Sequence, residues 1–223
     1  MKKSKPFFIT IEGGEGSGKT THSFLLKEYL EKKGFSVVLT REPGGTALAE
    51  SIRKIILEPN SNLVPLSELL LYEAARAQHI QEIILPALKS GKVVICDRFT
   101  DATIAYQGYG RKLDLALIQK LNDAASFGLK PFITIYMDID SAVGVSKAKK
   151  LDKEFYGKNG DRIEQESLSF HKAVRKGYLA LAKKYPKRIK IIRTNPDINK
   201  TWALIKKEID KKIDAWTHGR MDA

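Results

Sequence analysis

The chain has 223 residues, of which 43% are apolar and 29% charged, so it is long and apolar enough to bury a core and is not a disordered polymer. Its single cysteine, Cys96, excludes an internal disulfide, and no apolar run approaches the roughly 18 residues that a membrane span requires. We therefore expect a cytoplasmic protein with no membrane partner. The net charge of +13 favours an anionic partner, and residues 142–190 carry +9 of it.

Short β-branched or aromatic runs alternate along the chain with longer segments of helical periodicity. Strands are predicted at 6–12, 36–41, 92–98, 131–138 and 188–194. Helices are predicted at 18–33, 46–57, 67–90, 114–127 and 163–185, with a last one near 199–216. Pro86 should kink or break the third helix. Continuous apolar strands are typical of a parallel sheet covered on both faces, so we predict one α/β domain over residues 1–223 with five parallel strands flanked by helices.

The first predicted strand leads directly into the segment GGEGSGKT, which matches the phosphate-binding pattern G-x-x-x-x-G-K-[ST] and opens a predicted helix. Glycines allow the backbone to aim successive N–H groups at an anion, and the helix N-terminus adds a partial positive charge. Lys19 should reach the β- and γ-phosphates of a nucleotide, and Thr20 should bind Mg²⁺. The predicted ATP-binding residues are Gly13, Gly14, Glu15, Gly16, Ser17, Gly18, Lys19 and Thr20.

The third predicted strand ends in VVICDR, where Asp97 occupies the place of a magnesium-associated acid. Arg98 follows it, where a hydrolysing ATPase usually has a second acidic residue. An arginine at this place suits an enzyme whose second substrate is itself a phosphate. The N-K-x-D motif of GTPases is absent from the sequence. The pattern therefore favours transfer of a phosphoryl group to an acceptor over hydrolysis.

Three further segments contain groups that suit a planar base. They are TREPGGT (40–46), LLYEAARAQH (70–79) and DRFTDATIAYQGYGR (97–111). Tyr72 and Arg76 are four residues apart and share a helix face, as do Thr103 and Gln107 if the segment after Arg98 is helical. An aromatic ring, a guanidinium, a hydroxyl and an amide can stack on a base and form hydrogen bonds with its edge.

These motifs together resemble the bacterial thymidylate kinase family. The stretches EGGEGSGKTT, TREPGGT, LLYEAARAQH, DRFTDATIAYQGYGR and DRIEQE occur in the family's order and spacing, and the match spans nearly the whole chain. The resemblance implies a P-loop fold of the nucleoside monophosphate kinase type, with a lid at approximately 142–163. It also implies Mg²⁺-assisted transfer of the γ-phosphoryl group of ATP to dTMP, giving dTDP for dTTP synthesis. Family members are usually homodimers, so a homodimer is expected.

The resemblance implies a role for each matching residue in the acceptor site. Arg98 and Arg53 would hold the phosphate of dTMP, with Glu42 lining that pocket. Tyr72 would stack on thymine and Arg76 would face its O4 atom.

Other matching residues lie along the base and the sugar. Thr103 and Gln107 would meet the polar edge of the base, and Tyr106 would occupy the space of a ribose 2′-hydroxyl. Glu15 would lie near the sugar, the bridging arginine or a metal-bound water.

The expected lid, VSKAKKLDKEFYGKNGDRIE, is rich in lysine and has Arg162 as its only arginine. Some family members supply a transition-state arginine from the P-loop, but GGEGSGKT contains none. Members without it typically place arginines in the lid, so the resemblance implies that Arg162 is catalytic, with Lys147 and Lys149 as lesser candidates. The implied catalytic set is Lys19, Arg98, Arg162 and Glu15.

Two alternatives remain at this point. A deoxynucleoside kinase of the same fold would phosphorylate thymidine rather than dTMP. A nucleic-acid-stimulated P-loop ATPase would fit the basic segment 142–190, but its lysines are not interleaved with stacking aromatic residues, so we expect no nucleic-acid partner.

Overall fold

The computed structural model describes residues 7–59, 61–156 and 160–217. One sheet contains five strands, all parallel, in the order β2-β3-β1-β4-β5. The strands are β1 (Phe8–Gly13), β2 (Val37–Arg41), β3 (Val93–Asp97), β4 (Ile133–Asp138) and β5 (Ile189–Arg193). All five predicted strands are therefore present. Because β1 is central, the loop that follows it emerges between the ends of β3 and β4, where parallel sheets bind ligands.

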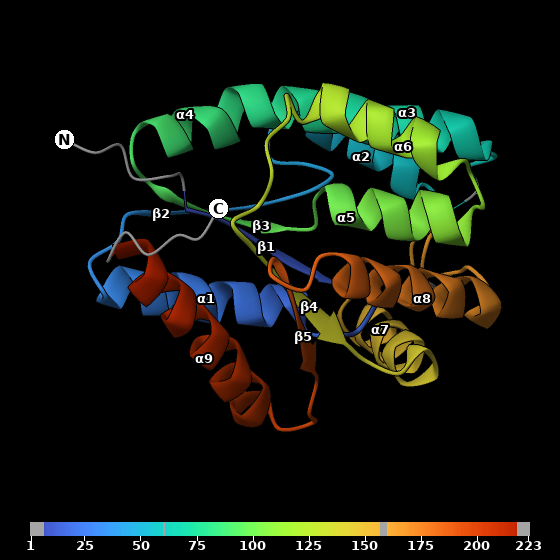
Figure 1. Cartoon of the computed structure of the whole chain (residues 1–223). Coiled ribbons are helices and arrows are strands. Elements are labelled where there is room, and N and C mark those ends of the chain that lie inside the picture. The colour runs from blue at the N-terminus through green and yellow to red at the C-terminus, as the bar shows by residue number, and fades with distance from the viewer. Residues whose placement is uncertain (1–6, 60, 157–159, 218–223) are drawn as a thin grey trace.

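The helices cover both faces of this sheet, with α1 and α9 on one side and α2 to α6 on the other (Figure 1). Helix α8 packs beside η2 against Tyr136 of β4 and Ile189 of β5, and α7 packs on α8. Their bounds are α1 (Lys19–Lys32), α2 (Ala47–Leu57), α3 (Pro65–His79), η1 (Ile80–Ile84), α4 (Leu85–Lys89), α5 (Thr100–Thr103), η2 (Ile104–Gly110), α6 (Leu115–Ala125), α7 (Ser141–Tyr156), α8 (Leu168–Lys184) and α9 (Ile198–Thr217). The segments η1 and η2 are π-helices.

The core is divided by the sheet because side chains alternate between its faces along each strand. On the face of α1 and α9, Ile9 and Ile95 pack with Leu26 and Ile209. On the opposite face, Phe8, Val94 and Cys96 pack with Ile80 and Ile84 of η1. Burial raises the pKa of the Cys96 thiol.

Three helical regions differ from the prediction. Helix α7 lies within the expected lid and was not predicted, because its lysine-rich sequence was interpreted by charge. The predicted third helix is divided into α3, a π-helical turn over Ile80–Ile84 and α4, and Pro86 is the second residue of α4, so the chain stays helical through the proline. Helix α8 begins at Leu168, later than the predicted residue 163, because Ser167 caps it by accepting a hydrogen bond from the backbone N–H of Phe170.

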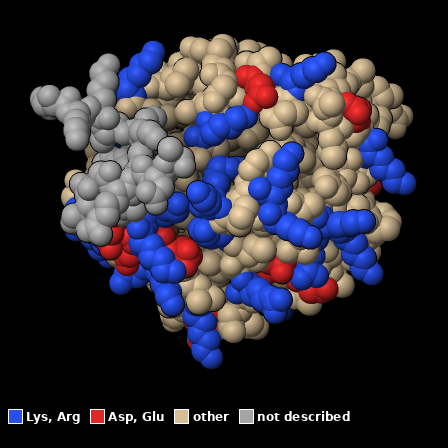
Figure 2. All heavy atoms as spheres, viewed as in Figure 1, with Lys and Arg blue, Asp and Glu red and all other residues tan. Residues whose placement is uncertain are grey.

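The excess positive charge belongs mainly to α8 and the chain that follows it, not to the lid. Residues 168–190 contain eight Lys or Arg and no Asp or Glu. Figure 2 shows Lys and Arg spread widely over the face in view, with few acidic side chains among them. The basic character is therefore a property of a broad surface and does not by itself mark the lid as a phosphate clamp.

Within the described part of the chain, no helix has both the length and the apolar composition that crossing a bilayer would need. A cytoplasmic location stays a prediction.

Candidate active site

A cavity of about 220 Å³ lies at the carboxyl ends of β1, β2 and β3, between the P-loop and the helices α3 and η2. The predicted residues that line it are Glu15, Lys19, Thr20, Glu42, Arg53, Tyr72, Arg76, Asp97, Arg98, Thr103, Tyr106 and Gln107. Every residue predicted to bind the acceptor is thus in one cavity with the phosphate-binding lysine. Asp161, Ile163 and Glu164, from the segment after the expected lid, line it as well.

The P-loop has the tight backbone that its glycines were expected to allow. A Cβ atom on Gly13 would lie 2.7 Å from the carbonyl oxygen of Met137, so no other residue fits there without a shift. Gly18 has φ +86°, in the left-handed region that glycine adopts freely, at the start of α1. Lys19 donates from Nζ to the carbonyl oxygen of Gly14 at 3.0 Å, which holds its charge over the loop.

Thr20 and Asp97 form the pair predicted to bind Mg²⁺. The Thr20 hydroxyl donates to Oδ2 of Asp97 at 3.3 Å. The second carboxylate oxygen, Oδ1, is buried and has no hydrogen-bond partner in the described residues. A buried carboxylate oxygen left unpaired is costly unless something binds it, and Mg²⁺ prefers oxygen ligands of this type. The donor set therefore fits Mg²⁺.

Arg98 links the P-loop to the acceptor side of the cavity. Its φ of +69° lies in the left-handed region, so the backbone turns sharply after β3. The guanidinium donates to the carbonyl oxygen of Gly13 at 3.1 Å and to Oε1 of Glu15 at 2.6 Å, and it lies 4.8 Å from the centre of the Tyr106 ring.

The Glu15 carboxylate also accepts a hydrogen bond from the Tyr106 hydroxyl at 2.7 Å. Burial alone would raise the pKa of Glu15, but the charges of Arg98 and Lys19 outweigh this effect and lower the pKa to about 2. Glu15 is therefore ionised at neutral pH and fixes both Arg98 and Tyr106.

Arg76 is almost fully buried and uses most of its hydrogen-bonding capacity within the protein. Nε donates to Glu42 at 2.8 Å, Nη1 donates to both Glu73 and Asn122 at 2.7 Å, and Nη2 donates to the hydroxyl of Thr103 at 2.8 Å. A guanidinium has five N–H donors, so one donor on Nη2 has no partner among the described residues and remains for a ligand.

Two of these partners were missed by the sequence reasoning. Glu73 is three residues before Arg76 on the same helix face, which was a usable signal. Asn122 lies 46 residues away in α6, and nothing in the sequence pairs it with Arg76.

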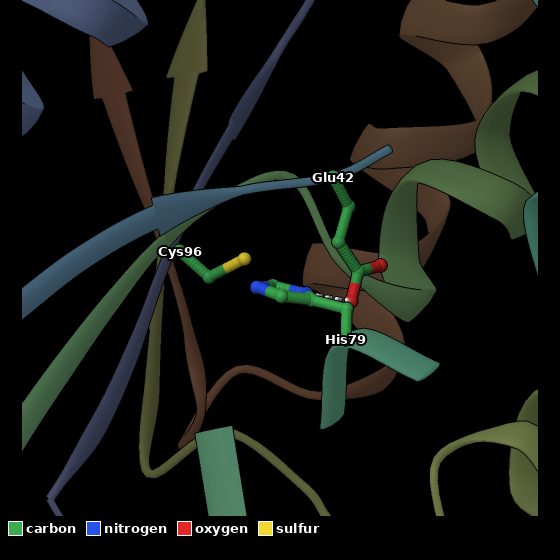
Figure 3. Close-up of side chains that lie close together, drawn as sticks. All are labelled: Glu42, His79 and Cys96. Carbon is green, nitrogen blue, oxygen red and sulfur yellow. Dashed lines mark hydrogen bonds and ion pairs between the residues drawn. The ribbon is translucent and has the colours of Figure 1, made fainter. Parts of the chain in front are cut away.

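Glu42, His79 and Cys96 place potential metal-ligand atoms within 4.8 Å of one another among the described residues (Figure 3). Each of these atoms already has a protein partner. The His79 ring contacts Glu42 through Nδ1 at 3.1 Å and Thr40 through Nε2 at 2.7 Å, while the Cys96 thiol donates to the carbonyl oxygen of Arg98. The adjacent Arg76 guanidinium would repel a cation. The group therefore fixes the segment 40–46 against α3 and does not fit a metal site.

Arg53 and Tyr72 complete the predicted acceptor residues. Arg53 donates from Nη1 to the carbonyl oxygen of Pro43 at 3.0 Å, which directs it across the segment 40–46. Burial is the main cause that raises the pKa of Tyr72, followed by the charge of Glu68, so its hydroxyl stays protonated at neutral pH.

Arg162 does not lie over the P-loop. Its Nε donates to the carbonyl oxygen of Ile56 at 2.9 Å, and its Nη2 forms an ion pair with the buried carboxylate of Glu68. A movement of Arg162 onto a transferring phosphoryl group would have to break both contacts. Its implied catalytic role stays a prediction that this arrangement does not favour.

Helix α7 contacts the P-loop through a pair of glycines. A Cβ atom on Gly16 would lie 2.2 Å from the carbonyl oxygen of Gly144, and a Cβ atom on Gly144 would lie 2.4 Å from that of Glu15. The same position on Gly16 is 3.1 Å from Cβ of Lys147. The lid helix thus begins directly against the phosphate loop. Residues 157–159 of the expected lid lie outside the described residues.

Comparisons with known proteins agree with this geometry. A family model described as thymidylate kinase matches residues 11–205. A thymidylate kinase of Citrifermentans bemidjiense is 48% identical over 210 residues, which cover 94% of this chain and 93% of that protein. One of Geotalea uraniireducens is 51% identical over 199 residues, which cover 89% and 93%. A solved thymidylate kinase from Ehrlichia chaffeensis is 41% identical, with a TM-score of 0.73, over 92% of this chain and 98% of that one.

Proposed function

The chain belongs to the thymidylate kinase family, and we propose that it transfers the γ-phosphoryl group of ATP to dTMP, giving dTDP, through the residues of the cavity. Its fold is that of the P-loop nucleoside monophosphate kinases. The observation that carries the proposal is the single cavity in which Lys19 of the P-loop meets Arg98, Tyr72 and Arg76. A P-loop alone would suit any nucleotide-driven protein, whereas this cavity offers groups for a phosphate and a base beside it.

The acceptor phosphate would lie between Arg98 and Arg53. A phosphate monoester has a second pKa of about 6, so it is largely dianionic at neutral pH and needs no general base to attack. The main barrier is then repulsion between two polyanions, which fixed cations relieve. Lys19 and Arg98 are such cations, and the ionised Glu15 orients Arg98.

The base would lie against Tyr72 with its polar edge toward Arg76. The free Nη2 donor of Arg76 suits a ring carbonyl oxygen. The Thr103 hydroxyl accepts from Arg76, so its own proton is available to a ligand. Gln107 offers an amide at the same edge, and Tyr106 occupies the sugar side.

Magnesium would be held by Asp97 and Thr20, whose oxygens fit it. When bound, the ion neutralises charge on the β- and γ-phosphates. Lys19 would bind the same two phosphates directly, while Arg98 would hold the acceptor phosphate.

We rank Lys147 ahead of Arg162 as the lid residue whose charge acts on the transferring phosphoryl group. The Cβ atom of Lys147 lies beside Gly16 of the P-loop, whereas Arg162 is held by Glu68. We expect Lys147→Ala to lower kcat about 10²-fold or more with little change in the KM for dTMP, since a cation at the transferring group is worth that much. Arg162→Ala should instead alter the KM for dTMP. A normal kcat in Lys147→Ala beside a strong loss in Arg162→Ala would reverse this ranking.

A homodimer is also part of the proposal. The exposed side chains Leu48, Ile55, Leu66 and Leu70 of the helices α2 and α3 form apolar surface that a second copy could cover. Light scattering coupled to gel filtration measures the mass in solution, and a mass of one chain would contradict a dimer.

The decisive assay couples ADP formation to NADH oxidation across a panel of acceptors. We expect dTMP to be the preferred nucleoside monophosphate and thymidine to be inactive. Preference for thymidine would instead indicate a deoxynucleoside kinase. ATP hydrolysis stimulated by DNA without phosphorylation of dTMP would indicate a nucleic-acid-dependent ATPase, and either result would refute the proposal.

A further inference from the structure

Glu68 is a fully buried carboxylate in the first turn of α3 that the proposed reaction does not use. Three side chains from different parts of the chain converge on it. Gln107 donates from Nε2 to Oε1 at 2.8 Å, and Arg111 donates from Nη2 to Oε2 at 3.0 Å. The third is Arg162, from the segment after the expected lid. A buried charge with this many partners is fixed in place before any substrate arrives.

The carboxylate of Glu68 determines which end of the Gln107 amide faces it. An ionised carboxylate only accepts hydrogen bonds, so the amide must turn its NH₂ group toward Glu68 and its oxygen away. Burial would raise the pKa of Glu68, but hydrogen bonds from Arg111 and Gln107 lower it below its usual value. Glu68 is therefore ionised and only accepts hydrogen bonds at neutral pH, and this fixes the orientation of the Gln107 amide.

The oxygen of Gln107 is then available to the cavity. Gln107 is among the residues that line it, and Oε1 receives no hydrogen bond from the described residues. An acceptor at this place suits a base whose ring nitrogen carries a hydrogen, as in thymine or uracil. It opposes cytosine, whose corresponding ring nitrogen is itself an acceptor. A reversed amide would favour cytosine.

We propose that Glu68 is a positioning residue that orients the Gln107 amide and thereby makes the cavity prefer a pyrimidine with a ring N–H. This inference rests on the proposed placement of the base beside Gln107. Glu68 touches no reacting atom and acts through Gln107.

The test compares kcat/KM for dTMP and dCMP in the wild-type enzyme and in Glu68→Gln. The new amide can donate to Gln107 and allow it to reverse, so we expect the ratio of dTMP to dCMP to fall about tenfold, the value of one misdirected buried hydrogen bond. Glu166→Gln is the matched control, because Glu166 also pairs with Arg111 but does not contact Gln107. Its ratio should stay at the wild-type value.

A merely structural role predicts a different result, because loss of packing lowers both activities and leaves their ratio unchanged. An unchanged ratio in Glu68→Gln, or an equal change in Glu166→Gln, would overturn the inference. If the wild-type enzyme does not phosphorylate dTMP, the proposed function itself is wrong. The wild-type activity is therefore measured before the variants are compared.

A second measurement avoids the variant, in case Glu68→Gln does not fold. The side-chain NH₂ signals of Gln107, identified by their loss in Gln107→Met, should exchange with solvent more slowly than those of the exposed Gln81, with no dTMP present. Exchange as fast as that of Gln81 would show that the NH₂ group does not face Glu68, and the inference would fail.

Discussion

Replacing Gly144 with alanine tests whether the packing of α7 on the P-loop is needed for catalysis. The added Cβ atom would lie 2.4 Å from the carbonyl oxygen of Glu15, whereas a carbon and an oxygen approach to about 3.3 Å. The helix and the loop would therefore have to separate by about 1 Å. A displacement of that size at a reacting group costs about 10² in rate, so we expect kcat to fall about a hundredfold.

The same variant should fold normally, since alanine is favoured over glycine in a helix by about 1 kcal/mol. The KM for dTMP should change little, because the acceptor residues lie on other elements. The coupled ADP assay gives kcat and KM, and thermal denaturation gives the Tm. Ser146→Ala is the matched control, because it is an alanine substitution at an exposed position of α7. A Gly144→Ala enzyme with normal Tm and a kcat within about threefold of wild type would refute the reasoning, given the rate sensitivity to misplacement.

Three further predictions concern the cluster around Arg98. Arg98→Lys, which loses the planar fork, should lower kcat/KM for dTMP by about 10³ in the coupled assay, and a loss below tenfold would contradict the assigned role. Asp97→Asn should raise the Mg²⁺ concentration for half-maximal velocity, and an unchanged Mg²⁺ titration would exclude Asp97 as a ligand. Because the pKa of Glu15 is lowered from its ordinary value of 4.5 to about 2, its ion pair stabilises the fold above pH 4.5, and that stability is lost as the pH falls through 2. In Glu15→Gln, the free energy of unfolding measured by urea denaturation at a series of pH values should fall less steeply with acid than in the wild type. An equally steep fall would contradict the assignment.

The sheet and the P-loop could be predicted because their signals are local. A continuous apolar strand such as the one ending at Asp97 has both faces buried, and this is readable from its composition alone. The motif from Gly13 to Thr20 likewise depends on neighbouring residues. The family resemblance extended this reading to residues far apart in sequence, and the cavity contains the acceptor residues that it implied.

The remaining features depend on contacts between distant segments. Helix α7 has a polar sequence, and its helical form is supported by packing on the P-loop and α8. These contacts cannot be read from the sequence, so the segment was interpreted from its charges alone. The π-helices η1 and η2 carry no compositional signal, since they arise from how the helix meets its neighbours. The position of Arg162 was set by Glu68, which is 94 residues away and was not singled out in the sequence.

The uniform positive charge from residue 168 to residue 190 affects how the enzyme meets its substrates. Both substrates are polyanions, and a positive surface attracts them over a Debye length of about 10 Å at 0.1 M salt. The rate of encounter, and with it kcat/KM at low substrate, should therefore fall as ionic strength rises, even though exposed lysines such as Lys183 and Lys187 do not line the cavity. Kinetic constants of variants are thus comparable only at one fixed ionic strength.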